Sequence, residues 1–239
     1  RIPLGVLVGE HAALRLQDAR TGIVFRCDQL DMILLSLAFS FDGLRPESIG
    51  KAPMTNLITL RENSAYSLRA QTILPSSTLP SHASMLTGLC PAQHGVYWND
   101  YVPENGYALG VNVFDLAHAA GLRTVMVVGK EKLRQIVRPE STDVFIFEEA
   151  DSSISNMAVE EIRAGFDLMF IHFPTGDVVG HEWGWGGGVQ RYAFREEDRF
   201  LGQILAALDE NGLRAGTLII ASADHGGYEH SHGGDLPQE

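Results

Sequence analysis

The sequence predicts an α/β fold in which a mostly parallel sheet is sandwiched between helices. Short apolar runs recur along the 239 residues, and the stretches between them show helical periodicity. Alternation of strand and helix on this scale is typical of a parallel sheet with both faces covered. The length and the hydrophobic fraction of 45% also suit one large domain with a continuous core. We therefore expect residues 1–239 to form a single domain.

The expected strands are five apolar runs: residues 32–41, 124–128, 144–147, 168–173 and 218–221. The longest of them is too short for the roughly 20 residues that a membrane span needs, so we expect a buried strand and no membrane span. The clearest helix precedes the last run, and its apolar positions follow the i, i+3, i+4, i+7 spacing: Leu201, Ile204, Leu205 and Leu208. Residues 113–120, closed by Gly121, form a second expected helix.

The charge balance excludes one class of partner. The formal net charge is −12, from 18 Lys and Arg against 30 Asp and Glu. Surfaces that bind nucleic-acid polymers or anionic membranes carry clustered basic side chains, which this chain lacks. We therefore expect no nucleic-acid polymer as a partner. Cys27 and Cys90 are too few for a disulfide framework, and we expect both to be small buried apolar residues.

The two ends of the chain carry no targeting information. The chain begins at Arg1, and nothing before residue 30 has the basic-then-apolar pattern of a signal peptide. The last residues read as a loop, so we expect the chain to be truncated at its C-terminal end. Localisation and oligomeric state stay unknown at this stage.

Polar residues stand where three of the expected strands end. Asp42 follows the first run, Asp177 lies in the segment after 168–173, and Asp224-His225 follows the last run. In open parallel sheets ligands collect beyond the carboxyl ends of the strands. This clustering therefore predicts a binding site at that edge.

Two of these groups contain metal-ligand types. Asp177 and His181 are four residues apart and share a face if the segment is helical, so both could reach one ion; a helix-capping Asp and a surface His would look the same. Asp224-His225 is followed by two glycines and then by His230 and His232, which is either a second ligand group or a terminal His-rich tail.

A third group contains a candidate nucleophile. In Thr78-Leu79-Pro80-Ser81 the proline fits the first turn of a helix. The hydroxyls before it would then lie near free backbone N–H groups and the positive end of the helix dipole. Thr78 is either a nucleophile there or a helix cap.

Taken in order, these motifs resemble the alkaline phosphatase superfamily, most closely its type I phosphodiesterase/nucleotide pyrophosphatase branch. The resemblance runs from about residue 32 to residue 235, and residues 1–31 do not match the usual opening of that family. A match of several motifs in fixed order is far more specific than any single one. The motifs are Asp42-Gly43, Thr78-Leu79-Pro80, Thr87-Gly88, His94-Gly95, the pair Asp177 and His181, Asp224-His225-Gly226 and His232-Gly233.

The resemblance implies a site with two divalent metal ions, zinc first and manganese as an option. It implies that the side chains at three positions hold one ion: Asp177, His181 and His232. It implies that four others hold the second: Asp42, Asp224, His225 and the hydroxylate of Thr78. Two dications would also supply the positive field that the acidic surface lacks.

The resemblance further implies hydrolysis of phosphodiester or nucleotide pyrophosphate bonds in a small-molecule phosphate ester or nucleotide, through a covalent phospho-threonine at Thr78. Ser81 stands where the family usually has Asn and would bind substrate through its hydroxyl. Asn99 either faces the substrate or is an exposed turn residue. His230 is the rival of His232 as a ligand, and an extracytoplasmic location is one option that the family allows.

Three alternatives stay open. The chain could be a phosphomonoesterase of the same superfamily, in which case Arg45 or Lys130 would hold the extra phosphate charge. It could be sulfatase-like, although Thr78 cannot become the formylglycine that sulfatases use. It could also be a truncated, non-catalytic relative that only binds metal. Trp183 and Trp185, beside His181, either stack on a nucleobase or pack in the fold.

Overall fold

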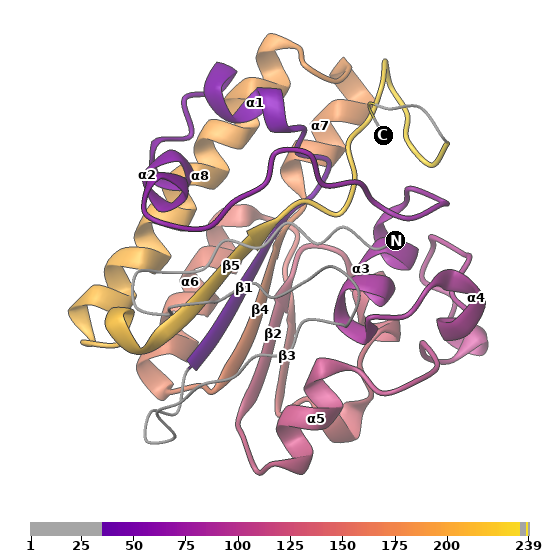
Figure 1. Cartoon of the computed structure of the whole chain (residues 1–239), viewed down its shortest axis with the longest axis vertical. Coiled ribbons are helices and arrows are strands. Elements are labelled where there is room, and N and C mark those ends of the chain that lie inside the picture. The colour runs from indigo at the N-terminus through magenta and orange to yellow at the C-terminus, as the bar shows by residue number, and fades with distance from the viewer. Residues whose placement is uncertain (1–34, 235–237, 239) are drawn as a thin grey trace, which may run out of the picture.

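A computed structural model describes residues 35–234 and 238 of the chain (Figure 1). The strands are β1 (Leu35–Phe41), β2 (Thr124–Val128), β3 (Val144–Phe147), β4 (Leu168–Phe173) and β5 (Thr217–Ser222). They form one parallel sheet in the order β3-β2-β4-β1-β5. The predicted α/β class with a mostly parallel sheet is therefore confirmed. The atypical segment 1–31, the first three residues of run 32–41 and Cys27 lie outside the described residues.

Helices cover both faces of this sheet. The α-helices are α1 (Pro46–Lys51), α2 (Thr55–Glu62), α3 (Thr78–Thr87), α4 (Pro91–His94), α5 (Val113–Ala119), α6 (Asp151–Ala164), α7 (Thr175–Trp183) and α8 (Gly188–Glu210). Short 3₁₀ helices lie at η1 (Pro103–Asn105), η2 (Glu131–Gln135), η3 (Pro139–Ser141) and η4 (Arg214–Gly216). The two predicted helices are α5 and the second half of α8. None of the helices in the described part is both long and apolar enough to cross a bilayer.

The strands supply two apolar cores because alternate residues point to opposite faces. In β2, Val125 and Val127 join the core under α1, α2, α6 and α8, whereas Met126 and Val128 join the core under α3 and α5. Figure 1 shows these two groups of helices on opposite sides of the sheet. Side chains that leave the carboxyl ends of the strands therefore enter a space walled by helices from both layers.

One expectation about the cysteines is wrong. Cys90 is exposed, because it stands directly before Pro91 in the surface turn where α4 begins. Its backbone N–H is bonded to the side chain of Gln93 there. A position that starts a short surface helix has no apolar layer against which a thiol could be buried.

Candidate active site

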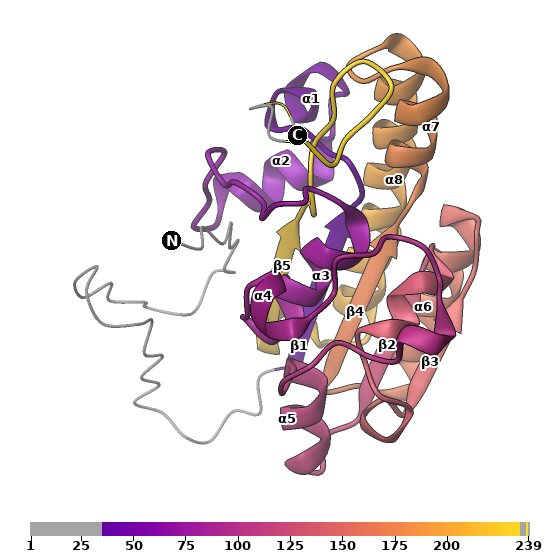
Figure 2. The same cartoon turned by 90° about the vertical axis from the view of Figure 1, so that its right-hand side faces the viewer.

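Four neighbouring strands end at one edge of the sheet, and the residues that follow them include the predicted site residues. Asp42 follows β1, the α7 residues follow β4, and Asp224-His225 follows β5. Lys130 enters from the end of β2. Figure 2 shows the segment after β5 passing beside α7, which carries Asp177 and His181. Residues that lie up to 190 positions apart in the sequence are thus brought together by the strand order.

The three carboxylates are buried and share one arrangement. In each, one oxygen is held by donors of the protein: Oδ2 of Asp42 by His172 and Lys130, Oδ2 of Asp177 by Lys130, and Oδ1 of Asp224 by the N–H groups of Gly43 and His225. The other oxygen of each has no hydrogen-bond partner among the described residues. Buried carboxylate oxygens without a donor are costly, so this arrangement calls for a positively charged ligand.

The three imidazoles share an arrangement too. Nδ1 of His225 lies 2.7 Å from the carbonyl oxygen of Gly226, and Nδ1 of His232 lies 2.9 Å from that of Ser76. Nδ1 of His181 lies 2.9 Å from the carbonyl oxygen of His230. Since a carbonyl only accepts, each Nδ1 carries a proton and each Nε2 is turned to the carboxylates. A histidine that binds metal through one nitrogen typically has its other nitrogen held in this way.

The free carboxylate oxygens and the Nε2 atoms converge. Nε2 of His225 lies 3.2 Å from Oδ1 of Asp42, 3.4 Å from Oδ2 of Asp224 and 3.9 Å from Oδ1 of Asp177. The same oxygen of Asp177 lies 3.4 Å from Nε2 of His232 and 3.5 Å from Nε2 of His181. The six predicted carboxylate and imidazole ligands therefore line one space.

Among the residues that the structure describes, two groups of three have ligand atoms close enough to hold an ion. One is Asp177, His181 and His232, the set that the resemblance implies for one metal. The other is Asp42, Asp177 and His225, with all ligand atoms within 4.8 Å of one another. The resemblance implies Asp224 in this second group, where the structure has Asp177. The free oxygen of Asp224 nevertheless faces the same imidazole of His225.

Thr78 lies in the same space. It is the first residue of α3 and is fully buried. Its Oγ1 lies 3.4 Å from Nε2 of His225 and 3.3 Å from Nζ of Lys130. The residue at the N-cap position is Ser77, which makes no side-chain capping bond. The hydroxyl of Thr78 is thus directed to the His225 imidazole and the Lys130 ammonium and does not cap the helix.

The two predicted substrate-binding residues differ in their placement. Oδ1 of Asn99 accepts from the backbone N–H of Leu79 at 2.9 Å and from Nζ of Lys132 at 3.0 Å, so Asn99 touches the residue next to Thr78. The hydroxyl of Ser81 lies 2.9 Å from that of Thr72. Asn99 therefore lies beside the candidate nucleophile, whereas Ser81 contacts Thr72 in a neighbouring loop.

Sequence reasoning missed two buried histidines and gave Lys130 only a secondary role. His172 of β4 bonds to Asp42, and His82 lies with Nδ1 2.7 Å from the carbonyl oxygen of Thr78 and Nε2 2.8 Å from Oγ of Ser40. Burial lowers the pKa of His82 to about 4, so its ring is neutral. An imidazole inside an otherwise apolar strand was the one available signal for His172.

The charges of the metal-free site offset one another in part. Burial disfavours the carboxylate of Asp42, yet Lys130, His172 and His225 together hold its pKa well below the usual range. Burial likewise opposes the charge of His225, but Asp224, Asp42 and Asp177 raise its pKa to about 9. The same carboxylates raise the pKa of Lys130 against its burial. Two protein cations thus face three carboxylates in the metal-free protein, and a dication can displace the proton on His225.

Two hydrogen bonds join the segment after β5 to α7. Nδ1 of His230 lies 3.1 Å from the carbonyl oxygen of His181, which reciprocates the bond between the His181 ring and the His230 carbonyl. The Trp185 indole donates to the carbonyl of Gly43 at 3.0 Å, so this tryptophan packs in the fold, while Trp183 is exposed. His230 thereby orients His181 without facing the carboxylates.

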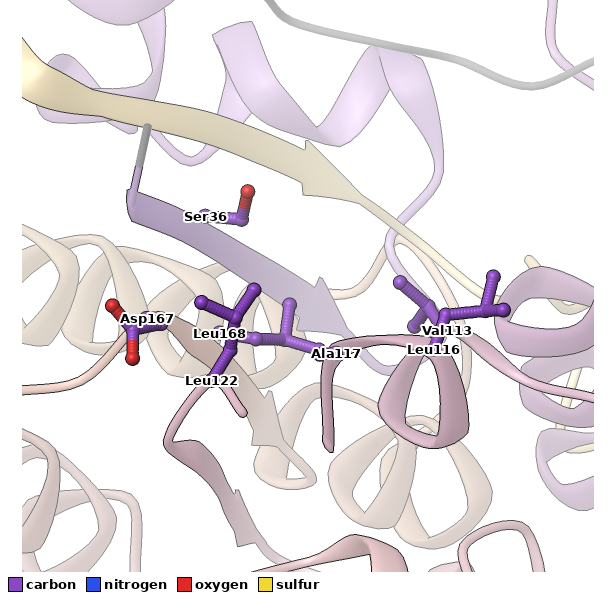
Figure 3. Close-up of a pocket in the computed structure, with 7 residues that line it drawn as sticks. All are labelled: Ser36, Val113, Leu116, Ala117, Leu122, Asp167 and Leu168. Atoms are coloured by element: carbon purple, nitrogen blue, oxygen red, sulfur yellow. The ribbon is translucent and has the colours of Figure 1, made fainter. Parts of the chain in front are cut away.

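A shallow cavity of about 280 Å³ lies at the opposite edge of the sheet (Figure 3). It is lined by Ser36, Val113, Leu116, Ala117, Leu122, Asp167 and Leu168. Its single carboxyl, Asp167, accepts from the backbone N–H of Arg123. This cavity brings together none of the predicted site residues.

Comparison with known proteins identifies a family that covers most of the chain. A family model described as type I phosphodiesterase / nucleotide pyrophosphatase matches residues 36–233. An uncharacterized pyrophosphatase/phosphodiesterase of Schizosaccharomyces pombe is 24% identical over 213 residues, which are 80% of this chain and 44% of that protein. A venom phosphodiesterase of Crotalus durissus collilineatus is 26% identical over 225 residues, which are 82% of this chain and 26% of that protein. The chain thus spans less than half the length of these relatives.

Solved structures share the fold. Murine ectonucleotide pyrophosphatase / phosphodiesterase 5 superposes with a TM-score of 0.68 at 19% identity, covering 80% of this chain and 57% of the murine one. An inactive variant of the same murine protein, solved in complex with AMP, superposes with a TM-score of 0.69 at 18% identity, covering 81% and 57%.

Proposed function

The chain belongs to the type I phosphodiesterase / nucleotide pyrophosphatase family, and on that basis we propose that it is a two-metal hydrolase of phosphodiester or nucleotide pyrophosphate bonds. Its reaction passes through a covalent phospho-threonine at Thr78. Its substrate is a small phosphate ester or nucleotide. The murine relative solved with AMP supports a nucleotide as the substrate class.

One observation carries this proposal. The hydroxyl of Thr78 faces a space in which three buried carboxylates each present one oxygen without a donor, and three imidazoles each present Nε2. Oxygen and imidazole nitrogen together suit zinc and manganese. The residues present therefore fit divalent metal ions, which we assign to Asp177, His181 and His232 for one ion and to Asp42, Asp224, His225 and Thr78 for the other, with Asp177 near both.

Divalent ions bound there supply Lewis acidity, which lowers the pKa of a coordinated hydroxyl and offsets phosphate charge. The chain supplies the rest. Oγ1 of Thr78, once it has lost its proton, attacks phosphorus, and the bond from phosphorus to the alcohol or phosphate leaving group breaks. Water then breaks the bond between phosphorus and Oγ1, which releases the phosphate monoester and restores the Thr78 hydroxyl. His82 is bonded to the Thr78 carbonyl and to Ser40, which anchors the first turn of α3 during both displacements.

Asn99 and Lys132 form the substrate side of the site. Because Oδ1 of Asn99 is engaged by Leu79 and Lys132, its amide nitrogen is the group that donates to a phosphoryl oxygen. Ser81 is a second donor once its hydroxyl turns away from Thr72. Asn99 and Ser81 thus position the phosphoryl group for attack by Thr78.

A phosphomonoesterase is the second candidate, and the position of Lys130 favours it. Nζ of Lys130 lies 3.3 Å from the Thr78 hydroxyl, where a cation can hold the additional charge of a monoester. Arg45, the other residue considered for this role, instead bonds to Glu47 and to the carbonyl of Gly227. A monoester and a diester must therefore be compared directly.

The test is hydrolysis of bis-p-nitrophenyl phosphate and of p-nitrophenyl phosphate, with and without added zinc. We expect zinc-dependent cleavage, higher kcat/KM for the diester, and loss of cleavage in Thr78→Ala. Thr87→Ala, at the far end of the same helix, is the matched control and should keep wild-type rates. Equal background rates for wild type and Thr78→Ala, with no bound metal, would instead identify a non-catalytic relative.

A further inference from the structure

The helix that carries Asp177 and His181 begins without a cap of its own. The residue before α7 is Pro174, whose side chain offers no hydrogen bond to the first turn. The first N–H groups of a helix need partners from elsewhere when they are buried. In α7 those partners come from two other helices.

Two carboxyl groups cap α7 from outside. The backbone and the hydroxyl of Thr175 favour the charged form of Asp151, the first residue of α6, and so lower its pKa against the effect of burial. Oε1 of Glu197, on α8, accepts from the N–H of Gly176 at 2.8 Å. Carboxyl groups at a helix N-terminus are favourable for the helix dipole as well as for the unpaired donors. Both capping groups are thus long-range replacements for a local cap.

The carbonyl group and the Cα of Gly176 are also in close contact with side chains of α8. Nε2 of Gln190 donates to the Gly176 carbonyl at 3.0 Å, and Oε1 of Gln190 is itself held by the N–H of Gly186 at 2.7 Å. The ring of Phe194 packs so close to Gly176 that an added Cβ would overlap it. Gln190, Phe194 and Glu197 lie on one face of α8 at i, i+4 and i+7, and all three are fully buried.

Acidic residues in this place are costly, which argues that they have a role. Burial raises the pKa of Glu197 well above its usual range, and the charge of Asp151 adds to the effect. Burial also raises the pKa of Asp151, to about 6. An apolar side chain would avoid this cost but would leave the N–H of Gly176 without an acceptor.

We propose that Gln190, Phe194 and Glu197 of α8, with Asp151 of α6, are positioning residues that set the register of α7 so that Asp177 and His181 meet one of the two metal ions. The inference rests on the proposed metal-dependent function. Gly176 is the residue directly before Asp177, so a shift of this turn displaces the carboxylate of Asp177. Glu197 therefore governs the affinity for one ion although it touches no ligand atom.

The test is calorimetric titration of zinc into the metal-free full chain. Wild type should bind two ions, and Glu197→Ala should bind one of them about 10- to 100-fold more weakly, the range typical for groups that orient ligands. Glu197→Gln should restore the affinity, because its amide oxygen can accept from Gly176 as the carboxyl does. Gln190→Met, which removes the bond to the Gly176 carbonyl, should weaken the same ion and serves if Glu197→Ala does not fold.

Asp198→Ala is the matched control. Asp198 is the next residue of α8, equally buried, but it accepts from the N–H groups of Asn56 and Leu57 at 2.9 and 2.8 Å and so caps α2, which carries no site residue. This variant should lower the free energy of unfolding and leave both zinc affinities unchanged. Unchanged zinc binding in Glu197→Ala and Gln190→Met, or an equal weakening in Asp198→Ala, would overturn the positioning role while the metal function stands. A wild-type chain that binds no zinc would overturn the metal function and this inference with it.

Discussion

Nε2 of His172 lies 2.9 Å from Oδ2 of Asp42, and the backbone N–H of Gly129 donates to the other ring nitrogen at 3.2 Å. Because a backbone N–H only donates, Nδ1 accepts, and Nε2 carries the proton that goes to Asp42. The bond holds Asp42 with its second oxygen turned to His225. A buried strand residue thereby decides which carboxylate oxygen faces the site.

Replacing His172 by Phe should weaken zinc binding by about 10- to 100-fold, since Asp42 loses the donor that orients it. Zinc titration measures the effect. His94→Phe is the control, because His94 is an equally buried histidine that bonds to Ser84 and Val96. A similar loss in both variants would contradict a specific role for the bond to Asp42.

Replacing Lys130 by Met should destabilise the metal-free protein by about 3 kcal/mol, because Asp42 and Asp177 lose the ammonium that lies 2.5 and 2.6 Å from them. Saturating zinc replaces that charge, so the rise in Tm on adding zinc should be larger in the variant than in wild type. Thermal unfolding with and without zinc is the measurement. Lys132→Met is the control and should show the wild-type rise, because the Lys132 ammonium bonds to Asn99.

Asp151 should make stability depend on pH. Burial raises its pKa from 3.8 to about 6, so the folded protein retains a proton that the unfolded chain releases. The contribution of Asp151 to stability is therefore lost as pH rises from about 4 to about 6, and Asp151→Asn lacks that contribution. The difference in the free energy of unfolding, variant minus wild type, should rise by about 3 kcal/mol across that range.

Urea unfolding of the metal-free proteins between pH 4 and pH 7 tests this. Asp209→Asn, on the exposed side of α8, is the control and should follow wild type at every pH. A difference for Asp151→Asn that stays flat with pH would show that this carboxyl is ionised in the folded protein.

Replacing Asn99 by Asp separates the two functions of this side chain. The variant keeps an oxygen for Leu79 and Lys132 but loses the amide donor. We expect kcat/KM for a phosphodiester to fall about 100-fold, as for the loss of one donor to a developing charge, with little change in Tm. Asn211→Asp, at the end of α8, is the matched control. Retention of wild-type kcat/KM would remove Asn99 from substrate binding.

The fold could be predicted from local sequence patterns because each pattern has a physical cause of its own. The runs 124–128, 144–147 and 168–173 coincide with β2, β3 and β4. Asp177 and His181 share one helix, which was the condition attached to their spacing, and Pro80 lies in the first turn of the helix that begins at Thr78. These features depend on neighbours in the chain, so they can be predicted from the chain.

The surroundings of the site could not be predicted in this way. Glu197 lies 20 residues from Asp177 and reads as one more charged residue of an amphipathic helix. His172 reads as an interruption of an apolar strand, and Cys90 was expected in the core but lies in a surface turn. Such roles arise from contacts across the sheet and between helices, which no local spacing records.

By itself, therefore, the amino-acid sequence determined the α/β class and the order of the strands along the chain, and it indicated the candidate metal ligands. Only the tertiary structure decided which oxygen of each carboxylate is free, which ring nitrogen each histidine presents, and that Lys130 lies between Asp42 and Asp177. The physical reason is that the hydrogen-bond partners of a buried polar group come from whichever strand ends and helices pack around it, and that packing is a property of the whole chain.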